Sequence, residues 1–387
     1  MKTLVLSSMI LTVICSLISG STLWAQCSND CPYLGSDILY KQKNCPFSKG
    51  TALMNIDVEG FTQYLSEEIK LEKGVVEASI KHIQDFNAFL QKNGKNINTA
   101  SYADFYDYST YLISIGQNTI DTYLSVLRYA YFKKANGLYV AALEVLDGRE
   151  VIENLSTRLI EEFGEEFRNE IFEGIEMPPL GLHPKKKPEY TKVLIQRFEE
   201  KLGTERCAQF LNKGLRYRYE EARKPDRELF LQCKNIDEFL ERKHKNFVAE
   251  LEECYNKGEL FFTQEITKEV LELVKNDKSI EVGVREGDKI IIKKIPHMAK
   301  EYLKETDEHM KRYYYCHCPW MKQAFLESDK PVSPVFCNCS AGYYRAYWEI
   351  VLDQPIQVEV VKSLLQGDSV CTFEVHLPKD IPRNLKQ

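Results

Sequence analysis

The segment from Tyr313 to Pro378 carries the most chemically specific pattern in the chain. Two Cys-x-Cys motifs, Cys316-His317-Cys318 and Cys337-Asn338-Cys339, are separated by 18 residues, and Cys371 follows them. Thiolates and imidazoles are ligands that zinc prefers, and four of them complete a tetrahedral site. Five thiols and one histidine exceed what one zinc ion needs. The sequence therefore predicts a zinc site here, although the spacing does not determine which four residues bind.

Other interpretations of these cysteines stay open. The four cysteines of the two motifs could form two disulfides, or they could be buried small side chains. One of them could also be a redox or nucleophilic thiol, if a neighbouring group lowers its pKa. The histidine inside the first motif and the odd number of cysteines after removal of the N-terminal segment favour a metal.

Aromatic side chains are concentrated around the cysteines. They predict a small-molecule pocket, because such pockets combine aromatic walls with a few polar groups, whereas ordinary core packing is the alternative. The candidate pocket residues are Tyr315, Trp320, Tyr343, Tyr347 and Trp348. The preceding residues Asp307, Glu308 and His309 could supply a general base, or they could form a solvated helix face. No catalytic residue is singled out.

The same segment resembles a known type of domain. Cys316-His317-Cys318-Pro319-Trp320, Cys339-Ser340-Ala341-Gly342-Tyr343, and Gly367-Asp368 before Cys371 and Phe373 resemble the 4-vinyl reductase-type ligand-binding domain and the L-2-amino-thiazoline-4-carboxylate hydrolase family. The resemblance implies a zinc held by Cys339, Glu359 and Cys371. Where those relatives carry a further cysteine, this chain has Ser363, so Cys316, Cys318, Cys337 or His317 would have to supply the missing ligand.

The elements that must position this cluster fall into an α+β pattern. Apolar residues recur at three- and four-residue spacing over residues 54–176, which predicts an all-helical bundle, with helices beginning near Ser101 and Thr119. A Pro- and Lys-containing linker is expected at 177–189. Residues 190–387 then predict helices followed by a mixed α/β domain. Its β-hairpins span residues 280–295, around Gly287-Asp288, and residues 356–377.

The helical bundle resembles the N-terminal, core-binding domain of tyrosine recombinases. The residues that carry this resemblance are mostly core positions, at 61–65, 86–90 and 118–128, so they report a fold. Acidic residues outnumber basic residues between positions 51 and 150. Nucleic acid is thus not the expected partner, and a DNA-binding adaptor is only an alternative function.

The N-terminus predicts export. Lys2 precedes an uncharged run from Leu4 to Ile18, and cleavage after Ala25 would remove a signal peptide over 1–25. An uncleaved membrane anchor is the alternative. A Cys-containing linker over 26–53 follows. A secreted, periplasmic or cell-envelope protein is expected, and disulfides can form in those compartments.

These patterns together predict a protein that binds a small molecule beside a zinc ion. The chain's 387 residues, net charge of -6 and hydrophobic fraction of 44% are those of an ordinary globular protein. A hydrolase of the L-2-amino-thiazoline-4-carboxylate type is the enzymatic alternative. The sequence leaves the ligand, the reaction and the oligomeric state undetermined.

Overall fold

The computed structural model of the chain describes residues 56–326 and 332–380. The expected signal peptide over 1–25 and the Cys-containing linker over 26–53 lie outside these residues. Within them the fold is α+β, as predicted, with helices throughout and two antiparallel sheets in the C-terminal half. No helix in the described ranges is long and apolar enough to cross a membrane.

The described chain divides into two compact units. We call residues 56–108 and 119–142 the helical unit, and residues 109–118 and 143–380 the mixed unit. The division crosses two helices, α4 (Tyr102–Ser114) and α6 (Asn136–Leu146).

The helical unit consists of short helices around an aromatic core. Its elements, besides parts of α4 and α6, are α2 (Val58–Gln63), the π-helix η2 (Tyr64–Glu68), α3 (Lys73–Gln91) and α5 (Ile120–Phe132). Thr119 begins α5 by accepting a hydrogen bond from the Thr122 backbone, as the sequence predicts. The rings of Phe61 and Tyr129 meet edge to face at 5.0 Å, and this contact ties α2 to α5.

Ten α-helices begin within the mixed unit, counting only the described residues. They are α7 (Glu150–Phe163), α8 (Glu165–Ile171), α9 (Lys187–Leu202), α10 (Thr204–Leu211), α11 (Glu220–Gln232), α12 (Ile236–Lys257), α13 (Lys268–Asn276), α14 (Ala299–Lys304), α15 (Glu308–Tyr315) and α16 (Asn338–Leu352). Short 3-10 helices lie at η3 (Pro184–Lys186), η4 (Lys322–Leu326), η5 (Pro334–Cys337) and η6 (Leu364–Gln366).

The expected linker at 177–189 is attached to the mixed unit at several points. The Ser109 hydroxyl donates to the Gly181 carbonyl at 2.7 Å, and the Asn118 amide donates to the Leu180 carbonyl at 2.9 Å. Lys187, the last residue of the lysine run, is buried, and its ammonium donates to the Glu144 carbonyl at 2.8 Å. Burial lowers the pKa of Lys187 to about 8. This lysine is therefore not solvated, unlike the usual member of such a run.

The main sheet of the mixed unit is antiparallel, in the order β3-β4-β6-β5. Its strands are β3 (Val284–Glu286), β4 (Lys289–Lys293), β5 (Gln357–Lys362) and β6 (Thr372–His376), whereas β1 (Leu260–Phe261) and β2 (Gln264–Glu265) form a separate pair. Both predicted strand pairs are present. The first strand is shorter than expected, because Glu281 and Gly283 have φ angles of 61° and 104°, outside the range of extended backbone.

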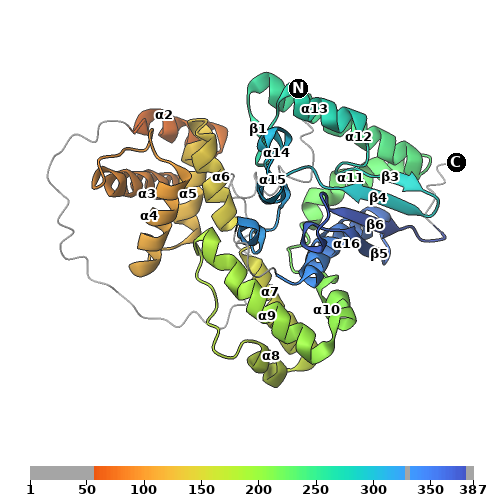
Figure 1. The fold of residues 1–387 in the computed structure, drawn as a ribbon. Helices are drawn as coiled ribbons and strands as arrows, with labels where there is room; N and C mark the ends of the chain where they lie inside the picture. The colour runs from red at the N-terminus through yellow and green to blue at the C-terminus, as the bar shows by residue number, and fades with distance from the viewer. Residues whose placement is uncertain (1–55, 327–331, 381–387) are drawn as a thin grey trace. The chain divides into compact units, whose positions relative to one another are not determined.

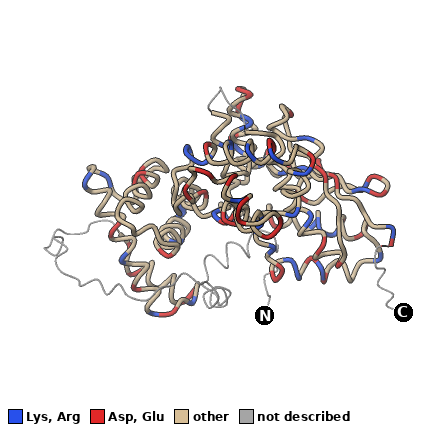
Figure 2. Tube along the Cα trace, turned by 90° about the horizontal axis from the view of Figure 1, so that it is seen from below, with Lys and Arg blue, Asp and Glu red and all other residues tan. Residues whose placement is uncertain are grey.

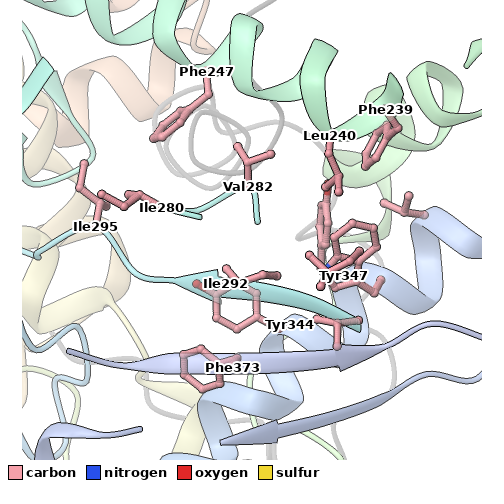
Figure 3. Close-up of a cluster of buried hydrophobic side chains, with 14 of the residues drawn as sticks. Phe239, Leu240, Phe247, Ile280, Val282, Ile292, Ile295, Tyr344, Tyr347 and Phe373 are labelled. Carbon is pink, nitrogen blue, oxygen red and sulfur yellow. The ribbon is translucent and has the colours of Figure 1, made fainter. Parts of the chain in front are cut away.

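One face of this sheet packs on helices. Along β4, Ile290 and Ile292 are buried, because side chains alternate between the two faces of a strand. They join Phe373 of β6, Tyr344 of α16 and Phe247 of α12 in one hydrophobic cluster, drawn in Figure 3. Helix α16 packs on β5 and β6 and α11 packs on α16, so the sheet and these helices form layers (Figure 1).

Charged residues of both signs are interspersed along both units (Figure 2). This distribution accompanies the chain's net charge of -6.

Candidate functional site

A cavity of about 920 Å³ lies inside the mixed unit. Its walls come from α11, α12, the end of α15, the loop after α15, η5, the start of α16 and the segment before β6. A volume in this range is typical of small-molecule sites. The cavity is therefore large enough to hold a small-molecule ligand.

All five cysteines of the C-terminal cluster line this cavity, as does His317. Cys316 and Cys318 follow α15, Cys337 ends η5, Cys339 lies in the first turn of α16, and Cys371 immediately precedes β6. The eight cysteines of the described residues are free thiols. Three separate segments of the chain, at 316–318, 337–339 and 371, thus bring the predicted sulfur and imidazole groups to one cavity.

Four of these thiols influence one another electrostatically. Burial raises the pKa of Cys316, and the neighbouring Cys318, Cys371 and Cys337 raise it further. Burial likewise raises the pKa of Cys337 to about 12, with contributions from Cys371 and Cys318. Without a cation beside them, these thiols are held in the protonated form. A bound zinc ion would reverse this preference, because zinc binds the thiolate.

Cys339 is also a neighbour of Cys318, whose pKa it raises, but it differs from the other four thiols in having Arg216 beside it. Burial raises its pKa, whereas Arg216 and a hydrogen bond from the Leu215 backbone lower it. Arg216 in turn is bonded to Asp147, and its Nε lies 3.4 Å from a Glu150 carboxylate oxygen. The Cys339 thiol thus lies near the Arg216 guanidinium, which favours its thiolate form.

Glu359 is not brought to the cysteines. It lies on the exposed face of β5, between the inward-facing Val358 and Val360, and it does not line the cavity. Its neighbours are Glu374 and His376 on β6, and ligand atoms of the three side chains lie within 4.8 Å of one another. Among the described His, Cys, Asp and Glu residues, no other group of three has ligand atoms this close together. Among the described residues, no three cysteine sulfurs therefore lie within that distance of one another.

Ser363, which stands where the related domains carry a cysteine, is fully buried beside Cys337. A hydrogen bond between its side chain and the Cys337 thiol lowers the pKa of that thiol, against the effect of burial. Cys337 therefore supplies a thiol next to the position where one is missing.

His317 is held as a neutral imidazole. Its Nε2 donates to the Ile295 carbonyl at 2.5 Å, which leaves Nδ1 as the acceptor. Burial lowers the pKa of His317 to about 3, and Lys294 contributes to this effect. The ring meets His297 edge to face at 5.2 Å. Behind His297, Lys322 donates to its Nδ1 at 3.1 Å and pairs with Glu144 at 2.7 Å.

The five aromatic candidates divide between the cavity and the core. Tyr315, Trp320 and Tyr343 line the cavity, and so does Tyr344, which the sequence does not single out. Tyr347 and Trp348 lie in the hydrophobic cluster beside it, with the Tyr347 hydroxyl donating to Asp226 at 3.1 Å.

The polar candidates that precede the cysteines, Asp307, Glu308 and His309, do not line the cavity. Asp307 begins α15 by accepting a hydrogen bond from the Met310 backbone at 2.8 Å. Glu308 and His309 are exposed and do not line the cavity. This arrangement is the solvated helix face, with Asp307 as its cap.

Several charged residues of the cavity were missed by sequence reasoning. Arg216, Asp226, Lys243, Glu281 and Lys294 all line it. Each looks like an ordinary surface residue in its own segment, so only the fold reveals them. Lys294, directly after β4, continues the inward series of Ile290 and Ile292, but this alternation cannot be recognised in a run of isoleucines and lysines.

Comparison with known proteins bears on part of the mixed unit. Residues 267–381 match a family of unknown function, DUF6144. The match contains the main sheet, α16 and the five cysteines of the cavity, whereas α11 and α12 lie outside it. No curated protein and no solved structure matches the chain.

Proposed function

We propose that the mixed unit binds a small molecule in its cavity, beside a zinc ion held by cysteines. The observation that carries this proposal is the convergence of five free thiols and aromatic rings on one cavity of about 920 Å³. The donor atoms suit zinc, because soft thiolates bind it strongly and no redox chemistry is needed.

The zinc ligands that we propose are Cys316, Cys318, Cys337 and Cys371. Cys318, Cys371 and Cys337 each raise the pKa of Cys316, so all three lie near Cys316. This set replaces Cys339, which lies beside Arg216, and Glu359, which faces solvent. The sulfurs would have to move toward one another by side-chain rotation as the metal binds. Zinc would supply charge to hold all four as thiolates.

Zinc affinity of the full chain, measured under reducing conditions by competition with a chromogenic chelator, tests the proposed ligands. We expect one zinc per wild-type chain. Cys316→Ser, Cys337→Ser and Cys371→Ser should each weaken binding by about 100-fold or more, since thiolate ligands account for much of zinc affinity. Cys254→Ser, a control outside the cavity, should leave binding unchanged.

Two further variants discriminate between the ligand sets. Cys339→Ser and Glu359→Gln should keep zinc affinity close to that of the wild type, whereas loss of zinc in either would support the set implied by the resemblance. A chain without zinc, whose cysteines at 316, 318, 337 and 339 are blocked when thiols are counted after denaturation, would contradict the metal site and favour disulfides.

Binding of a small molecule can be tested directly on the purified chain. Mass spectrometry under non-denaturing conditions should detect zinc together with a small organic molecule, and denaturation should release both. A chain that carries no such molecule and whose thermal unfolding is unchanged by any member of a metabolite library would contradict ligand binding.

A further inference from the structure

Three basic side chains line the cavity, and they differ in their partners. Arg216 is bonded to Asp147 and Lys243 is paired with Asp226 at 2.7 Å. Lys294 forms no ion pair within 4.0 Å with any described carboxylate, and its ammonium donates a hydrogen bond to the Ser340 hydroxyl at 3.4 Å. Lys294 is therefore a cation of the cavity wall that no described carboxylate pairs with directly.

The backbone of Lys294 is fixed from both sides. Its N–H donates to the Cys371 carbonyl at 3.4 Å, and its own carbonyl accepts from the Tyr315 hydroxyl at 2.7 Å. The ammonium lies 5.8 Å from the ring centres of both Tyr344 and Phe373, which are labelled in Figure 3. The neighbouring Lys293 points to the other face and pairs with Asp277 at 2.8 Å.

Glu281 is the acidic side chain of the cavity that influences Lys294 from outside ion-pair distance. Burial raises the pKa of Glu281, although Lys294 and a hydrogen bond from the Ile295 backbone oppose that rise. Its Oε1 accepts the Ile295 N–H at 2.8 Å. The carboxyl group thus has its own fixed partner and leaves the Lys294 ammonium open to the cavity.

An ammonium group that loses part of its hydration is stabilised by an anion that replaces the lost water. Apolar walls strengthen this attraction, because they lower the local dielectric constant. In the cavity these walls include Phe247, Val282 and Ile295 (Figure 3). The ligand that complements both features has an apolar body and one anionic group.

We propose that Lys294 binds the anionic group, a carboxylate or a phosphate, of a partly apolar ligand in this cavity. The inference rests on the proposed ligand-binding function and gives its ligand a chemical class. Lys294 acts as a binding residue, and the aromatic rings beneath its ammonium hold it in place by cation–π contacts.

Three fluorescent probes of the same ring system test this inference on the full zinc-loaded chain: 2-naphthoate, 2-naphthyl phosphate and the neutral 2-naphthalenemethanol. The wild type should bind at least one anionic probe more tightly than the neutral one. Lys294→Gln should weaken that anionic probe by about tenfold or more, the range of one charge-assisted hydrogen bond. The neutral probe should bind both proteins alike, and whichever anion loses more affinity identifies the preferred group.

Lys293→Gln is the matched control, because it removes the same charge one residue away on the opposite face. It should keep all probe affinities within about twofold, which is below the effect of a direct charged contact. Unchanged anion binding in Lys294→Gln, or an equal loss in both variants, would overturn the inference. If Lys294→Gln weakened zinc binding but left probe binding unchanged, the inference would also be overturned, because Lys294 would then balance the charge of the metal site. A wild-type chain that binds none of the three probes would contradict the proposed function as well.

Discussion

Gly342 lies in α16 between the cysteines and the cavity tyrosines, and it faces Gly214 at close range. A Cβ atom at position 342 would lie 2.4 Å from both the Cα and the N of Gly214. These neighbours are backbone atoms, so the helix itself would have to shift. The glycine of the Cys-Ser-Ala-Gly-Tyr motif is therefore required by the close packing of α16 against Gly214.

Gly342→Ala should destabilise the mixed unit by about 2 kcal/mol or more, as overpacked sites do. Gly137→Ala is the control, because Gly137 is also helical and a Cβ there meets nothing within 4 Å. That change should be neutral or stabilise by up to about 1 kcal/mol, from helix propensity. Urea denaturation measures the free energy of unfolding of both variants. If Gly342→Ala were no less stable than Gly137→Ala, α16 would be able to move away from Gly214.

At this scale, sequence predicts residue types better than partners. The thiols and His317 do meet at one cavity, because their chemistry is concentrated in a short segment. Glu359 does not join them, since the alternation of β5 turns it to solvent. Lys294 was missed because the two faces of β4 cannot be told apart from a run of isoleucines and lysines alone.

The start of α4 shows what local sequence determines at the scale of an element. The Ser101 backbone N–H donates to the Asp104 carboxylate at 2.9 Å, and the Asp104 N–H donates back to the Ser101 hydroxyl at 3.3 Å. Lys95 pairs with the same carboxylate at 2.6 Å. Desolvation alone would raise the pKa of Asp104, but the hydrogen bonds from Lys95 and Ser101 outweigh it and lower the pKa.

Asp104→Asn should destabilise the helical unit by about 1 kcal/mol at pH 7, the usual value for a helix cap. Because the folded-state pKa is lowered, this stabilisation is complete above the unfolded pKa of about 3.9 and is lost as the pH falls through the folded value. The difference from wild type should thus shrink between pH 4 and pH 2, on the scale of these pKa values. Urea denaturation at several pH values measures it, with the exposed Asp107→Asn as control. An equal loss at every pH would mean that the carboxylate charge is not responsible.

Other elements depart from their predicted bounds for local reasons. The segment before the cysteines forms two helices, α14 and α15, because α14 ends at Lys304 and Asp307 caps a new helix. The strand expected from Ile280 is reduced to Val284–Glu286, because a Cβ at Gly283 would lie 2.4 Å from Ile290 and its φ is 104°. Such features depend on packing against another segment, so periodicity cannot show them.

The whole molecule is the scale at which sequence reasoning is least informative. The α+β class follows from periodicity alone and is confirmed. The division into a helical and a mixed unit instead depends on contacts between distant residues, such as Ser109 with Gly181 and Trp320 with Gly148. The cavity likewise needs α11 and α12, whose sequences carry no chemical signal.

The division into units leads to a prediction that concerns the whole chain. If zinc binds to the cysteines of the mixed unit, it stabilises that unit by mass action, by up to about 4 kcal/mol at 1,000 times its dissociation constant. Amides of β4, β6 and α16 that exchange by unfolding of this unit should then exchange up to about 1,000-fold more slowly. Amides of α3 in the helical unit should change little.

Hydrogen exchange followed by mass spectrometry, with and without zinc, measures both sets of peptides in one experiment. Cys316→Ser serves as the control, since it should abolish the slowing in the mixed unit without altering α3. Equal slowing in α3 would show that the two units unfold together, because a ligand of one unit protects the other only when their opening is a single event. If amide exchange in the mixed unit is still slowed by zinc in Cys316→Ser, the zinc binds elsewhere and Cys316 is not one of its ligands.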